Sequence, residues 1–165
     1  MERPLRPVPV TSLHRVLEII AGMSLTATLV LTAWRFGALP ESVPVHFDAS
    51  GNPTRYATRM LVWVLPMTTI GVYGALGWLS RIPHRLNYPV EITESNASGQ
   101  YANAVLMIRV LKAIVLGQLA SLTFFQQQVA LGIHNKLPVW WLPVTVGCIL
   151  VSIVVFAIRG FSVRQ

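Results

Sequence analysis

The stretch VWWLPVTVGCILVSIVVFAI, residues 139–158, decides the fold class, because it is as long as a membrane-spanning helix and carries no charged residue. A hydrocarbon core of about 30 Å requires about 20 helical residues. A helix also satisfies every backbone donor and acceptor within one segment, which lipid cannot do. We therefore predict a transmembrane helix over residues 139–158.

Three further apolar stretches precede this segment, at residues 16–34, 60–80 and 104–129. The third has a short apolar core, and residues 99–112, of mixed polarity, are expected to begin its helix before it enters the membrane. Helices that cannot leave the bilayer pack against one another. The sequence therefore predicts a single all-α integral membrane domain over residues 1–165, a bundle of four transmembrane helices.

The composition supports a membrane protein. Apolar residues make up 53% of the chain and charged residues 12%, about half the usual share for a globular protein. The mean hydropathy is +0.57, which excludes a disordered chain or a coiled coil. The formal net charge of +7 would suggest nucleic acid in a soluble protein. Here the basic residues border apolar runs, so we expect anionic lipid headgroups as partners and no nucleic acid.

The basic residues also predict an orientation. Four spans place both termini on one side, and cytoplasmic loops carry an excess of Lys and Arg. With cytoplasmic termini, nine basic residues lie inside: Arg3, Arg6, Arg15, Arg81, Arg85, Arg109, Lys112, Arg159 and Arg164. Four remain outside: Arg35, Arg55, Arg59 and Lys136. We therefore predict a multi-pass membrane protein with cytoplasmic N- and C-termini, an outer loop at residues 35–59 and a cytoplasmic loop at residues 81–103.

The outer loop contains the stretch LPESVPVHFDASGNPTRYATR, residues 39–59. Apolar and other residues alternate over residues 43–47, which is the periodicity of a strand with one apolar face. Residues 48–53 are rich in turn-forming types. The loop, rich in Pro and Gly, is therefore expected to be structured, with an extended segment, a tight turn and a return to the second helix. Pro44 excludes a central strand.

This stretch resembles the LPxxVPxHFxxxGxPxxYxxR signature of a bacterial membrane domain family of unknown function. The same domain forms the amino-terminal part of the immunity protein against the sporulation-delay peptide toxin. The matching residues are Leu39, Pro40, Val43, Pro44, His46, Phe47, Gly51, Pro53, Tyr56 and Arg59. The resemblance covers residues 16–130 and implies a protein of the bacterial cytoplasmic (inner) membrane. It also implies that the motif residues bind a ligand or brace the loop.

Two interpretations of His46 and Asp48 remain open. The first is proton sensing or metal binding, since histidine can titrate near neutral pH or ligate a metal. Both residues lie on one face of the extended segment, and His134 in the second outer loop could supply a third metal ligand. A zinc site requires three or four ligands. The interpretation that we favour is that both side chains brace the turn through hydrogen bonds, and we predict no metal and no cofactor.

Glu18 is the single acidic residue in a predicted span, with Arg15 three positions before it. An intramembrane carboxylate is a candidate proton relay or cation partner. The simpler interpretation is that Glu18 reaches the interface and pairs with Arg15. Arg109 and Lys112 share one face of the third span and could pair with Glu18 or extend to the headgroups, which we favour. Gln118 could join a polar network between helices.

No catalytic motif is present, and we predict that the protein is not an enzyme. The first hypothesis is recognition of a ligand or peptide at the outer face, with toxin immunity, resistance or envelope signalling as the output that the resemblance implies. The second is a small transporter or channel subunit, which could act as a homodimer and would use Glu18, Gln118 and Arg109. The third is an accessory or structural subunit of a larger membrane complex with a protein partner.

Overall fold

The computed structural model describes residues 3–162, so that the prediction made for Arg164 lies outside the described residues. The chain is mostly helical. Its four long helices are α1 (Ser12–Arg35), α2 (Val64–Leu79), α3 (Ala97–Ala130) and α4 (Trp141–Ser162). Each is long and apolar enough to cross a membrane, α2 together with the short 3-10 helix that precedes it. The described chain therefore has the helices of a multi-pass membrane protein.

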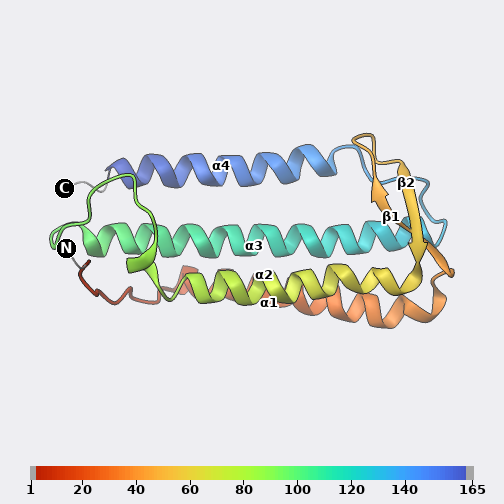
Figure 1. The fold of residues 1–165 in the computed structure, drawn as a ribbon, viewed down its shortest axis with the longest axis horizontal. Coiled ribbons are helices and arrows are strands. Elements are labelled where there is room, and N and C mark those ends of the chain that lie inside the picture. The colour runs from red at the N-terminus through yellow and green to blue at the C-terminus, as the bar shows by residue number, and fades with distance from the viewer. Residues whose placement is uncertain (1–2, 163–165) are drawn as a thin grey trace.

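Helix α3 is the centre of the arrangement. It packs against α1, α2 and α4, while α1 also packs against α2. Helix α4 lies on the far side of α3 from α1 and α2 (Figure 1). Most of the apolar surface of α4 is exposed, as is usual for a helix that faces lipid.

The residues between α1 and α2 form a small antiparallel sheet, which corrects the all-α prediction. Strand β1 (Ser42–Phe47) pairs with β2 (Pro53–Thr58), and Val43 lies opposite Ala57. The extended segment predicted at residues 43–47 is therefore a strand, and its return is a second strand. Pro44 is compatible with β1 because both strands of a two-stranded sheet are edges, where a missing N–H is tolerated.

The sheet lies across one end of the helices, which we call the hairpin end (Figure 1). Leu39, Val43 and Val62 form a buried apolar cluster there, with Phe36 and Trp63 packed against it. The opposite end, where α1 and α3 begin and α2 and α4 finish, is called the terminal end. Burial of the apolar side of β1 thus holds the hairpin onto the helix ends.

Helices α1 and α3 begin earlier than the predicted spans. Thr11 caps α1, since its Oγ1 accepts a hydrogen bond from the His14 N–H at 3.3 Å. Helix α3 begins at Ala97, ahead of the span at residues 104–129 and close to residue 99, where the helix is expected to begin. Gln100 Nε2 donates to the Gly160 carbonyl at 2.8 Å, and the Tyr101 hydroxyl donates to the Pro4 carbonyl at 3.1 Å. These contacts stabilise a first turn that hydropathy alone does not reveal.

Candidate functional site

The tip of the hairpin is attached to the loop between α3 and α4 through Gly51. The Leu137 N–H donates a hydrogen bond to the Gly51 carbonyl at 2.8 Å. Gly51 has a φ of +82°, and a Cβ at this position would lie 2.3 Å from the Leu137 carbonyl oxygen. Positive φ and close backbone approach both favour glycine. The glycine of the sequence motif is therefore required by this contact.

A second attachment joins β1 to α3. Gln126 Nε2 donates to the Pro44 carbonyl at 2.8 Å, and Gln126 is 6% exposed. The motif residues Leu39 and Val43 are buried in the apolar cluster of the hairpin end. These motif residues therefore hold the hairpin in place and are not accessible to a ligand.

Asp48 braces the turn between the strands. Its Oδ1 accepts hydrogen bonds from the Ser50 N–H at 2.9 Å and the Asn52 N–H at 2.8 Å, and its Oδ2 accepts one from Asn52 Nδ2 at 3.0 Å. The hydrogen bonds from the side chain and the backbone N–H of Asn52 have the largest effect in lowering the pKa of Asp48 below its ordinary value, and the backbone N–H of Ser50 adds to it. The carboxylate is thus stabilised in its charged form.

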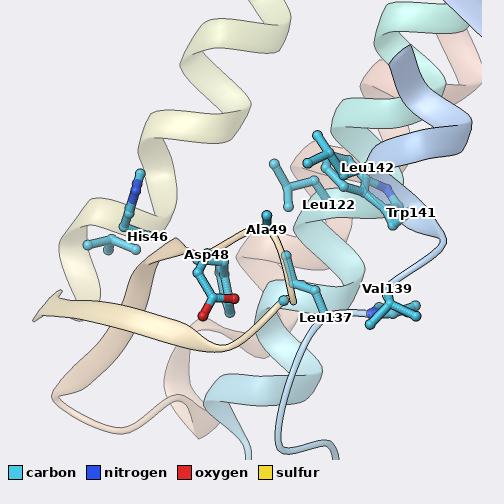
Figure 2. A pocket seen from close by; sticks show the side chains of 12 residues that line it. His46, Asp48, Ala49, Leu122, Leu137, Val139, Trp141 and Leu142 are labelled. Carbon is cyan, nitrogen blue, oxygen red and sulfur yellow. The ribbon is translucent and has the colours of Figure 1, made fainter. Parts of the chain in front are cut away.

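His46 does not share this role. Its side chain is exposed, and within residues 3–162 no hydrogen bond of the His46 ring is found. Figure 2 shows the ring directed away from the Asp48 carboxylate. Among the described residues, no group of three His, Cys, Asp or Glu side chains could hold a metal ion. The bracing interpretation therefore applies to Asp48 and not to His46.

A cavity of about 220 Å³ lies between the hairpin and the start of α4 (Figure 2). Most of its surface is apolar, and His46, Asp48 and Ala49 border it on the hairpin side. Its remaining lining includes Val45, Phe47, Leu122, Leu137, Trp141 and Leu142. The indole of Trp141 is fixed, because its Nε1 donates to Ser121 Oγ at 2.8 Å. The motif thus contributes one wall of a preformed apolar cavity.

The other motif residues lie around this cavity without lining it. Pro40 and Tyr56 are exposed, and Pro53 begins β2. The guanidinium of Arg59 lies 5.3 Å from the ring centroid of Phe36, a cation–π distance. His46, Pro40 and Tyr56 are therefore the motif residues that the fold leaves accessible.

A separate polar cluster lies between helices α1, α2 and α3. Lys112 Nζ lies 2.7 Å from Glu18 Oε1, and the Tyr73 hydroxyl donates to the same oxygen at 2.6 Å. The Lys112 side chain is 3% exposed, and that of Glu18 is 40% exposed. Lys112 Nζ also lies 3.5 Å from the centroid of the Tyr73 ring. The Glu18–Lys112 ion pair thus connects α1 with α3, and the hydroxyl of Tyr73 joins α2 to it.

This pair corrects two of our interpretations. Among residues 3–162 the partner of Glu18 is Lys112 instead of Arg15, and Lys112 does not extend to the headgroups. The reason is tertiary, because α1 packs along α3 and places the two side chains together. The ammonium of Lys112 lies close to the backbone of α2, since a Cβ at Gly77 would be in van der Waals contact with Nζ at 3.5 Å.

The two remaining polar candidates lie elsewhere. Arg109 Nη1 donates to the His14 carbonyl at 3.4 Å, near the terminal end. Gln118 Oε1 accepts a hydrogen bond from Thr145 Oγ1 at 2.9 Å and thereby joins α3 to α4. The predicted set of Glu18, Gln118, Arg109 and Lys112 is therefore divided among three contacts.

Four residues of these contacts were not predicted from the sequence as site residues: Tyr73, Gln126, Leu137 and Trp141. A buried Gln in an apolar helix was the available signal for Gln126. Nothing in the sequence pairs Leu137 with Gly51, because the contact depends on how two distant loops meet.

No curated protein and no solved structure matches the chain at a significant level. A family does match part of it, and the matched residues run from α1 through the hairpin into α2. The matched residues include the whole motif of the outer loop. They do not include the loop after α3, which completes the cavity. Residues 23–70 match the family model of a domain of unknown function, DUF1648.

Proposed function

We propose that the protein is a non-enzymatic integral membrane protein of the bacterial inner membrane that recognises a peptide at its outer face. The observation that carries this proposal is the apolar cavity of about 220 Å³ at the hairpin end. Its walls are preformed by the attached hairpin and by Trp141, and exposed His46 lies at its border. A preformed apolar cavity with few polar groups is the usual form of a binding site.

The size of the cavity favours a peptide ligand. Sites for small molecules typically enclose about 300–1,000 Å³. A volume of about 220 Å³ suits one large apolar side chain, while the rest of a peptide would lie on the exposed hairpin. Toxin immunity or resistance is then the output, in accordance with the resemblance of the motif.

The orientation that we propose places the hairpin end outside and both termini in the cytoplasm. The support is the excess of basic residues predicted for the terminal side, among them Arg6, Arg81 and Arg109 around one cavity at that end. This arrangement exposes the hairpin cavity to peptides that approach from outside the cell.

Survival of bacteria under a panel of membrane-active antimicrobial peptides tests the proposal. Cells that express the protein are expected to survive at least one peptide at a concentration that kills control cells. His46→Ala, which removes a ring at the border, and Ala49→Phe, which adds a ring into the cavity, are both expected to abolish this protection.

His134→Ala is the matched control, because His134 is also exposed at the hairpin end but does not line the cavity. This variant is expected to protect as well as the wild type. Each variant is also purified, and an unchanged melting temperature shows that it folds. Protection by none of the peptides, or protection that both cavity variants retain, contradicts the proposal.

A second candidate function is transport, and the Glu18–Lys112 pair is the observation that favours it. Charged groups inside a membrane protein commonly mark ion or proton pathways. Transport predicts that Glu18→Gln abolishes ion flux in proteoliposomes while the protein still folds. Peptide recognition predicts that the same variant still protects cells.

A further inference from the structure

The terminal end contains a cavity of about 490 Å³ that is separate from the hairpin end. Three arginines and two histidines line it: Arg6, Arg81, Arg109, His14 and His84. No Asp or Glu is among its lining residues. Four parts of the chain contribute to this wall: the N-terminal segment, the start of α1, the chain after α2 and the N-terminal third of α3. The cavity is therefore a strongly basic concave surface built from four parts of the chain.

Two of the three guanidinium groups have no carboxylate partner among residues 3–162. Arg109 Nη1 makes one long hydrogen bond of 3.4 Å, to the His14 carbonyl, and its Nε is buried without a hydrogen-bond partner. The guanidinium of Arg81 makes no hydrogen bond within residues 3–162. Arg6 is paired with Glu94 at 2.6 Å, and both side chains are largely exposed. The guanidinium groups of Arg81 and Arg109 therefore bring positive charge to the cavity without an ion-pair partner among the described residues.

The cavity lies where two helices end. His14 is in the first turn of α1, and Arg81 follows the last residue of α2, Leu79. Helix α3 starts at Ala97, so its N-terminal part extends from Arg109 past the ends of α1 and α2 for about 18 Å, at about 1.5 Å per residue. The basic groups are thus level with the ends of apolar helices, which is the depth of the lipid phosphates when these helices span a membrane.

We propose that this cavity binds a phosphate group between Arg81 and Arg109. The planar guanidinium matches phosphate oxygens with two parallel hydrogen bonds, and both arginines line the cavity. The depth of the site favours the headgroup of an anionic phospholipid as the source of the phosphate. A soluble phosphate compound offers the same chemistry, so the experiment distinguishes the two sources.

The full chain is purified in detergent, stripped of lipid and titrated with phosphatidylglycerol, with phosphatidylcholine of the same acyl chains or with inorganic phosphate. Bound lipid is counted by native mass spectrometry, and the melting temperature is measured in parallel. Phosphatidylglycerol is expected to bind at one site per chain and to raise the melting temperature, and phosphatidylcholine is expected to do neither. If inorganic phosphate raises the melting temperature equally, the source is soluble phosphate.

Arg81→Gln and Arg85→Gln form a matched pair, because both side chains are exposed but only Arg81 lines the cavity. Arg81→Gln is expected to weaken the binding of the phosphate ligand about tenfold, the loss that corresponds to one charge-assisted contact. Arg85→Gln is expected to bind like the wild type. Arg109→Lys keeps the charge but removes the fork, and it is expected to weaken binding as well. Equal affinity of Arg81→Gln and Arg85→Gln for phosphatidylglycerol and for phosphate overturns the proposal.

Discussion

The backbone N–H of Leu137 donates a hydrogen bond to the carbonyl of Gly51 at 2.8 Å, and this contact joins the hairpin to the loop between α3 and α4. A side chain at position 51 would meet the carbonyl of Leu137 instead of solvent. The cavity of the candidate site lies between these same two loops. Its shape therefore depends on a backbone contact that only glycine permits.

Replacement of this glycine is expected to destabilise the protein. Gly51→Ala introduces a positive φ for alanine and a contact of 2.3 Å with backbone, at a cost of about 2–3 kcal/mol. Gly132→Ala is the control, since its φ of +71° is similar but no atom lies within 4 Å of the added Cβ. Its cost is expected to be about 1 kcal/mol. Thermal unfolding in detergent measures both, and equal losses would show that the Leu137 contact is unimportant.

His46 and Asp48 are expected to respond differently to removal. His46→Ala is expected to change stability by no more than about 0.5 kcal/mol, because the ring is exposed and makes no hydrogen bond within the described chain. Asp48→Ala removes three hydrogen bonds and is expected to loosen the turn. Hydrogen exchange of residues 48–52 measures the difference. Faster exchange in His46→Ala would restore a bracing role for the histidine.

The turn is expected to weaken in acid. Hydrogen bonds from Asn52 lower the pKa of Asp48 in the folded protein, so the folded state binds the proton less tightly than the unfolded state. The contribution of Asp48 is thus complete above its ordinary pKa of 3.8 and is lost as the pH falls through the lower folded value. Nuclear magnetic resonance of the Asn52 amide follows this loss. Asp48→Asn is expected to remove the pH dependence, and its persistence would assign it to another group.

Removal of Glu18 is expected to destabilise the protein more than removal of Lys112, its partner in the ion pair between the helices. Glu18→Ala leaves the buried ammonium of Lys112 without its carboxylate and is expected to cost about 2–3 kcal/mol. Lys112→Met is expected to cost less, since the remaining Glu18 is 40% exposed. The double variant should be more stable than Glu18→Ala alone.

Arg15→Ala serves as the control for this pair, because Arg15 is exposed and belongs to neither ion pair of the described chain. It is expected to change stability by no more than about 0.5 kcal/mol. Chemical or thermal unfolding of the four variants measures the coupling. Additive effects of Glu18→Ala and Lys112→Met would show that the two groups do not interact.

The proposed orientation predicts that a cysteine at the hairpin end can be labelled from outside the cell, whereas a cysteine at the terminal end cannot. In a Cys148→Ala background, Ala49→Cys is expected to react with a membrane-impermeant maleimide in intact cells. Ser98→Cys, an exposed position at the start of α3, is expected to react only after the cells are opened. The reverse pattern would place the hairpin end in the cytoplasm and contradict peptide recognition from outside.

The sequence alone was sufficient for the features that depend on local composition. Long uncharged stretches such as residues 139–158 must be helical wherever lipid surrounds them, so four candidate spans are readable without a structure. The strand at residues 43–47 follows from alternation, and the turn after it follows from the Asp, Ser, Gly, Asn and Pro within residues 48–53. Both are properties of short segments.

Only the tertiary structure decided which distant residues meet. Hydropathy gives no register between helices, so it could not select Lys112 over Arg15 as the partner of Glu18. The same is true of the contact between Gly51 and Leu137, and of the basic groups that the ends of α1 and α2 bring to Arg109. The physical reason is that a span is specified by its transfer energy into lipid, whereas a site requires side chains from several helices at hydrogen-bond distance.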